Sequence, residues 1–253
     1  MVSKFIEALG VKTHYVSGGS GTETLVFLHG WGGSTESFTR LSEDLPYKII
    51  LLDLPGFGQS GMPDSKGWDT HDYASWLEAF LKKLNIQKAH FYGHSFGCRV
   101  LVRLLLKRPE LADKVILTGA AGIKWPLSFR QRVAKFMSAF KIKKMIPEKI
   151  QLCIKRKIFK AHDWADAHPE IKPTLQKVLA EEDFREELKK TQNNILLIWG
   201  AQDKITPIKS AHVYENNLQN ATLTILPNGR HGIHHTHVQE VSGLIQNFLG
   251  LLS

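Results

Sequence analysis

The stretch Ala89-His90-Phe91-Tyr92-Gly93-His94-Ser95-Phe96-Gly97 carries the strongest structural signal in this chain of 253 residues. Its first four residues form a mostly apolar run of strand length, and residues 98–106 place apolar side chains at helical spacing. The pattern G-x-S-x-G is weak alone. Between a strand and a helix, it predicts a tight turn that exposes the serine hydroxyl in a strained conformation. The helix would also aim free N–H groups at the atoms that the hydroxyl attacks. We therefore expect Ser95 to be a nucleophile.

Strand and helix patterns alternate outward from this turn along most of the chain. An opening hairpin over residues 6–16 ends at a glycine-rich turn, and Thr206 is the expected N-cap of a helix that begins at Pro207. Alternation of this kind predicts a mostly parallel sheet with helices on both faces. The expected strands are 24–29, 48–53, 89–92, 114–118, 195–199 and 221–226, and the expected helices are 37–45, 70–84, 95–106, 207–216 and 238–252.

Residues 120–191 interrupt the alternation with helical patterns alone. Phe129, Phe136 and Phe140 recur at helical spacing, and the segment lies between two predicted strands. Its chain position puts it over the carboxyl ends of the strands, where ligands bind in such folds. We therefore expect a core of residues 1–120 and 192–253 with a helical cap of residues 121–191.

A serine nucleophile needs a base that an acid orients. Asp203 follows a buried strand and is the candidate acid, and His231 follows the last strand and is the candidate base. Two alternatives stay open. Asp53 also ends a strand, where we expect its carboxylate to bind backbone N–H groups of a turn. His234 competes with His231, because the bulky Arg230 precedes the latter.

Acyl transfer also needs donors for the developing oxyanion. The loop His29-Gly30-Trp31-Gly32-Gly33 follows a buried parallel strand and should curl against the turn at Ser95. The backbone N–H groups of Trp31 and Phe96 are the expected donors. His29 itself is expected to be a structural residue, hydrogen-bonded under this loop.

These motifs together resemble those of the α/β-hydrolase superfamily, in its serine carboxylesterase and lipase-like branch. The resemblance rests on His29–Gly33, Asp53-Leu54-Pro55-Gly56-Phe57-Gly58-Gln59-Ser60, Gly93–Gly97, Trp199-Gly200-x-x-Asp203 and the late His231, and it spans nearly the whole chain. It implies the α/β-hydrolase fold, with an eight-stranded sheet and a helical cap inserted after the sixth strand. It also implies that Ser95, Asp203 and His231 form a catalytic triad.

Composition is that of an ordinary globular protein. The chain is 43% hydrophobic and 23% charged, and its longest apolar runs are shorter than a membrane span. The N-terminus does not read as a secretory signal, and the two cysteines, Cys98 and Cys153, form no disulfide framework. A cytoplasmic location is expected. We expect no cofactor and no metal site, since His234, His235 and His237 match no common zinc spacing.

The net charge of +9 is concentrated in residues 124–160, which hold twelve lysines and arginines and one acid, Glu148. Such a segment could steer anionic substrates, an acidic carrier protein or an anionic membrane surface toward the cap. The alternative is that these charges are simply solvated helix faces. No nucleic-acid-binding module accompanies them. The oligomeric state is not readable from the sequence.

The expected activity is hydrolysis of carboxylic esters with small to medium apolar acyl groups through an acyl-enzyme. Trp125, Phe129, Phe136 and Phe140 are the candidate pocket residues. Carbon–carbon bond hydrolysis or acyl transfer by the same triad, and a non-enzymatic small-molecule receptor on this fold, are the alternatives.

Overall fold

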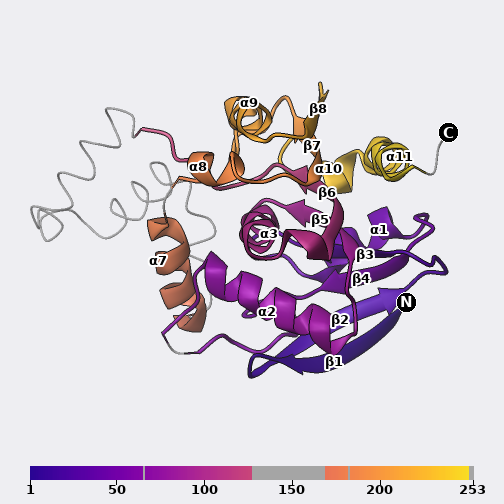
Figure 1. Ribbon diagram of the computed structural model, residues 1–253, viewed down its shortest axis with the longest axis vertical. Coiled ribbons are helices and arrows are strands. Elements are labelled where there is room, and N and C mark those ends of the chain that lie inside the picture. Colours follow the sequence, from indigo (N-terminus) through magenta and orange to yellow (C-terminus); the bar gives the residue numbers. More distant parts are fainter. Residues whose placement is uncertain (65, 127–168, 182, 251–253) are drawn as a thin grey trace, which may run out of the picture.

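The computed structural model of the protein describes residues 1–64, 66–126, 169–181 and 183–250. Its centre is an eight-stranded sheet in the order β1-β2-β4-β3-β5-β6-β7-β8 (Figure 1). Strand β2 is antiparallel to β1 and β4, and all other neighbours are parallel. The predicted α/β-hydrolase architecture is confirmed. The strands are β1 (Val2–Ala8), β2 (Val11–Gly18), β3 (Thr24–Leu28), β4 (Lys48–Leu52), β5 (Ala89–His94), β6 (Ala112–Thr118), β7 (Asn194–Gly200) and β8 (Ala221–Leu226).

Helices cover both faces of the sheet, and each face has its own hydrophobic core. One core lies beneath α2 (Thr70–Lys83), α3 (Phe96–Lys107) and α9 (Ile208–Asn217). The other lies beneath α1 (Thr39–Ser42), α10 (Ile233–Thr236) and α11 (Val238–Leu249). Because the middle strands are covered on both faces, they consist of nearly continuous apolar residues.

The predicted elements are present, but several boundaries differ. The hairpin expected over 6–16 runs from Val2 to Gly18, and the strand expected over 114–118 begins at Ala112. The helix expected over 37–45 is a 3-10 turn at Thr35–Phe38 followed by the single turn of α1. The last helix ends at Leu249 because Gly250 adopts a left-handed conformation, with φ of 92°, that stops it. Helix α9 has Pro207, not Thr206, at its N-cap position. The Thr206 hydroxyl instead turns toward Asp203.

The insertion follows the sixth strand, as predicted. Its described part contains a 3-10 turn at Pro169–Ile171 and helices α7 (Lys172–Ala180) and α8 (Arg185–Leu188). Figure 1 shows α7 beside α2. The candidate pocket residues Phe129, Phe136 and Phe140 lie outside the described residues. So does the basic segment from residue 127 to residue 160. The division into core and cap remains a prediction.

Buried ion pairs hold this part of the insertion against α3. Arg99 Nη2 lies 2.5 Å from Glu181 Oε2 and donates to the Val178 carbonyl at 2.7 Å. One turn later, Arg103 pairs with Glu187. Glu181 also accepts hydrogen bonds from the backbone N–H and the hydroxyl of Thr70, the first residue of α2. Helices α2, α7 and α8 therefore meet at Arg99 and Arg103 of α3.

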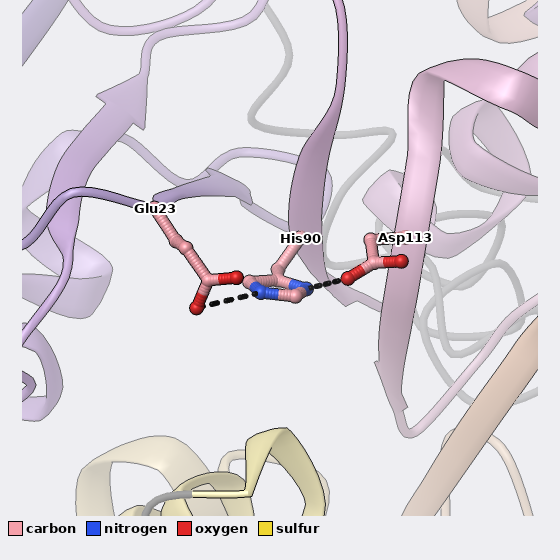
Figure 2. A group of neighbouring side chains, drawn as sticks. All are labelled: Glu23, His90 and Asp113. Atoms are coloured by element: carbon pink, nitrogen blue, oxygen red, sulfur yellow. Dashed lines mark ion pairs between the residues drawn. The ribbon is translucent and has the colours of Figure 1, made fainter.

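A second polar group lies at the amino ends of three neighbouring strands. Figure 2 shows the His90 ring between the carboxylates of Glu23 and Asp113, each 3.6 Å from a different ring nitrogen. Both separations are longer than a hydrogen bond. Lys88 lies 2.6 Å from Asp113 and already compensates its charge. This group joins the starts of β3, β5 and β6 at the edge opposite Ser95.

No helix in the described ranges combines the length and the apolar character that crossing a membrane would require.

Candidate active site

Ser95 occupies a strained turn between β5 and α3. Its φ of 49° and ψ of −104° put a non-glycine residue in an unfavourable region. The flanking glycines allow the strand and the helix to approach so closely. A Cβ at Gly97 would collide with the Leu28 carbonyl oxygen, and one at Gly93 would lie 3.1 Å from the Cys98 nitrogen. The packing of two elements thus forces the conformation of the serine between them.

Asp203 and His231 form a hydrogen-bonded pair at the carboxyl edge of the sheet. His231 Nδ1 lies 2.8 Å from Asp203 Oδ2, so Nδ1 carries the proton and Nε2 is left as the basic nitrogen. The other carboxylate oxygen accepts the N–H groups of Ile205 and Thr206 at 2.8 and 2.9 Å. Burial raises the pKa of Asp203, but hydrogen bonds from His231 and Thr206 and the charge of His231 outweigh it. The net pKa lies below its ordinary value.

The competing histidine, His234, pairs with no acid of the described ranges. Its side chain is buried, and its Nδ1 has no hydrogen-bond partner among those residues. Burial, followed by the charges of His235 and His231, lowers the pKa of His234 to about 3. Its ring packs 4.3 Å from that of His94, whose ring in turn lies 4.6 Å from that of His231. The geometry therefore favours His231 as the partner of Asp203.

The turn and the loop after β3 lie against each other as expected. A Cβ at Gly30 would lie 3.3 Å from the Ser95 Cβ, and the rings of Trp31 and Phe96 meet edge to face at 5.2 Å. Among described residues, neither the Trp31 nor the Phe96 backbone N–H donates a hydrogen bond to the backbone or a side chain. Two unpaired donors next to a serine hydroxyl are the arrangement that an oxyanion requires.

His29 supports this loop from below, as predicted. Its Nδ1 lies 2.7 Å from the Gly30 carbonyl oxygen, and its Nε2 accepts the Leu54 N–H at 3.0 Å. Burial lowers the pKa of His29 to about 4, although the Gly30 carbonyl and the charge of Asp53 oppose this shift. Asp53 accepts backbone N–H groups of Thr35 and Gln59 at 2.6 and 2.8 Å, which confirms its expected role in shaping the turn.

A pocket of about 280 Å³ opens at Ser95. Its described lining includes Trp31, Phe96, Trp125 and Thr206, and Arg99 is the only charged residue in this described part of the lining. Ser95 Oγ and His231 Nε2 make no hydrogen bond with the residues that the structure describes. Catalytic hydrogen bonds are often long before substrate binds. The pocket, the serine and the His–Asp pair nevertheless share one edge of the sheet.

Two contributors were missed in the sequence. Thr206 was interpreted as a helix cap, yet its hydroxyl lies 2.7 Å from Asp203 Oδ2 and 3.2 Å from His231 Nδ1. Arg99 was counted only as part of the helix after the turn. Its position four residues after Ser95, one helical turn, was a signal that could have placed it near the pocket. Cys98 is a buried thiol, as expected, and burial raises its pKa.

Comparison with known proteins defines the family. The family model described as "alpha/beta hydrolase fold" matches residues 23–151, which is half of the chain. The protein therefore belongs to the alpha/beta hydrolase family.

The protein is similar to several hydrolases over nearly its whole length. It is 24% identical to the 2-hydroxy-6-oxononadienedioate/2-hydroxy-6-oxononatrienedioate hydrolase of Escherichia coli, across 94% of this chain and 91% of the relative. A bacterial membrane phospholipase A superposes with a TM-score of 0.78 at 21% identity, covering 98% of this chain and 85% of that one. The meta-cleavage product hydrolase of Pseudomonas fluorescens superposes with a TM-score of 0.75 at 20% identity, covering 99% and 98%. These structural similarities establish the shared fold.

Proposed function

We propose that the protein hydrolyses carboxylic esters with small to medium apolar acyl groups, using Ser95 as nucleophile, His231 as base and Asp203 as its orienting acid. The observation that carries this proposal is the strained Ser95, which lines a mostly apolar pocket beside two N–H donors that bond to no described residue. A strained backbone conformation costs free energy and persists only where surrounding structure enforces it, often at functional sites.

The reaction would proceed in two steps. Ser95 Oγ attacks the ester carbonyl while His231 Nε2 takes the hydroxyl proton, and the Trp31 and Phe96 N–H groups bind the oxyanion. His231 then protonates the departing alcohol, leaving an acyl group on Ser95. Water, activated by His231, releases the acid. The ionised Asp203 stabilises the imidazolium and fixes its tautomer in both steps.

Turnover of p-nitrophenyl hexanoate by wild type and by Ser95→Ala tests this proposal. Wild type is expected to release p-nitrophenol catalytically, and the variant to lose nearly all activity. Mass spectrometry of the quenched wild-type reaction should show a hexanoyl adduct on the peptide that contains Ser95. A variant that retains most of the activity, or an adduct elsewhere, would refute the assignment. A folded wild type that turns over no substrate would favour the receptor alternative.

Carbon–carbon bond hydrolysis is the second candidate. The relative from Escherichia coli is named for hydrolysis of an oxo-dienedioate, and it aligns with nearly the whole chain. The same serine, base and oxyanion donors could serve a ketone substrate. An assay with a 2-hydroxy-6-oxo-dienoate, in which loss of the compound's visible absorbance reports turnover, discriminates between ester hydrolysis and carbon–carbon bond hydrolysis. Faster turnover of this compound than of any p-nitrophenyl ester would favour the second candidate.

A further inference from the structure

We propose that Arg99 is an anion subsite of the pocket, which selects substrates that carry a carboxylate on an otherwise apolar acyl chain. This inference rests on the proposed function, because it concerns the substrate of the same pocket. Arg99 stands one helical turn after Ser95 on α3, and both residues line the pocket. Its position puts a positive charge near the atom that attacks the substrate.

The guanidinium group has unused hydrogen-bond donors. An arginine presents five N–H donors. In Arg99 the bonds to Val178 and Glu181 both come from Nη2. The remaining nitrogens, Nε and Nη1, donate to no described residue, and Nε is fully buried. Because Nε has no accessible surface, a ligand in the pocket can reach only Nη1, and a carboxylate that accepts from Nη1 gains a charge-assisted hydrogen bond.

The rest of the pocket suits an apolar chain with one anionic end. The other described lining residues are uncharged, and apart from Ser95, Thr206 and Ser210 they are apolar, aromatic or glycine. A neutral substrate would leave Nη1 without an acceptor among the described residues. A basic substrate would be repelled. A carboxylate is the group that both the charge and the free donors favour.

Glu181 does not cancel this preference. Its carboxylate is also held by the backbone N–H and the hydroxyl of Thr70, at 2.5 and 2.8 Å. The N–H lies at the first turn of α2, where the helix dipole favours negative charge. Glu181 therefore has stabilising partners apart from Arg99, and it does not itself line the pocket.

Further positive charge lies beside Trp125, a residue of the pocket lining. The Lys209 ammonium lies 3.8 Å from the centre of the Trp125 ring, and the Arg185 guanidinium lies 5.2 Å from it. Trp125 lines the same pocket. Arg185 is paired with Asp183, but Lys209 forms no ion pair with a carboxylate of the described residues. An anionic substrate would thus meet one cation beside Trp125 and another at Arg99.

Two esters of equal length test the proposal: p-nitrophenyl hexanoate and p-nitrophenyl hydrogen adipate, which differ in a terminal methyl or carboxylate. We expect wild-type kcat/KM to favour the adipate ester by about tenfold or more. Arg99→Met should reduce this ratio to near one, and comparing the two esters within one variant cancels any loss of activity that affects both. Equal kcat/KM values in wild type, or an unchanged ratio in Arg99→Met, would overturn the proposal.

Glu181→Gln is the matched control, because it breaks the same ion pair and keeps the arginine. A subsite predicts that its adipate preference stays or rises, since a competing carboxylate has gone. If the ion pair matters only for structure, both variants lose the preference together, and the proposal fails. This control also decides the question if Arg99→Met does not fold.

Binding of both esters to Ser95→Ala, measured by calorimetry, separates the two proposals. If wild type hydrolyses neither ester, the proposed function fails. Tighter binding of the adipate ester would then still support the Arg99 subsite, and equal binding would refute it as well.

Discussion

Two His–Asp pairs in the described part of the chain have nearly the same hydrogen-bond geometry, and only one of them contacts Thr206, which lines the pocket at Ser95. His231 and Asp203 are 2.8 Å apart, and His14 and Asp53 are 2.7 Å apart. A serine hydroxyl even accompanies the second pair, with Ser3 Oγ 2.8 Å from His14 Nε2. Judged by hydrogen bonds alone, Ser3, His14 and Asp53 form the more complete triad.

Their surroundings separate the two pairs. The His14 and Asp53 side chains are each 1% exposed, whereas the His231 side chain is 18% exposed. Ser3 lies in a regular edge strand, whereas Ser95 occupies a strained turn. Asp53 holds two backbone N–H groups in place. A His–Asp hydrogen bond alone therefore does not indicate a catalytic role. Solvent access to the histidine, a neighbouring pocket and oxyanion donors are what suit such a pair to catalysis.

The serines give the sharpest test of this comparison. Ser95→Ala is expected to lower esterase kcat by about 10⁴-fold or more, because the nucleophile is lost. Ser3→Ala should leave kcat unchanged within about twofold, since an exposed hydroxyl away from the pocket contributes little. Steady-state kinetics with one p-nitrophenyl ester measures both. Comparable losses in the two variants would contradict the distinction.

The acids should separate activity from stability. Asp203→Asn is expected to lower kcat on the order of 10⁴-fold, because the amide favours the wrong imidazole tautomer. Asp53→Asn should cost about 2 kcal/mol or more of unfolding free energy, because the amide cannot accept all the bonds that the carboxylate does. Thermal unfolding and kinetics on both variants check this. If Asp53→Asn proves as stable as wild type, its proposed structural role is wrong.

Thr206→Val tests how much the contacts of the Thr206 hydroxyl with Asp203 and His231 contribute to activity. This change removes only the hydroxyl that contacts Asp203 and His231. We expect roughly a tenfold loss in kcat, from one hydrogen bond to a charged group, with KM nearly constant. Thr206→Ser should restore activity. Failure of serine to rescue would mean that the methyl group's packing, not the hydroxyl, supports the site.

His234→Phe should have the smallest effect on rate, with kcat within about threefold of wild type. Its larger effect is on pH dependence. The pKa of His234 is about 3 in the folded protein and 6.5 when unfolded, so the unfolded state binds the extra proton below pH 6.5. This histidine therefore lowers stability as pH falls from 6.5 toward 3, by up to about 1.4 kcal/mol per pH unit. Urea unfolding at pH 7 and pH 5 should show that the free energy of unfolding falls less between these pH values in the variant than in wild type. The same fall in both proteins would contradict this prediction.

Sequence reasoning reached most of the fold, because apolar runs and helical spacing report burial directly. The hairpin, the order of strands and helices, and the sharp turn at Ser95 all follow from local patterns. The boundaries at Ser42 and Leu249 did not, since they depend on single turns and on a left-handed glycine. The Thr206 error has the same origin. A hydroxyl that could accept backbone N–H groups as a helix cap instead donates its proton to a carboxylate three residues earlier.

The site was predictable where residues follow strands and less so where helices meet. Asp203 and His231 could be placed because parallel strands end at one edge. The spacing of Arg99 from Ser95 could have placed it near the pocket, but its ion pair could not be predicted, because Glu181 lies 82 residues away along the chain. Likewise, no pattern in the sequence indicates that Ser3, His14 and Asp53 come together.

The close fit around Ser95 also limits how this site can be changed. Glycines 93 and 97 have no room for a side chain, whereas residue 95 itself points into open space. A different reactive group, such as a thiol or a carboxylate, could replace the hydroxyl without disturbing the backbone that presents it. The turn can thus present different reactive side chains at residue 95, and protein engineers could change this residue while keeping the flanking glycines.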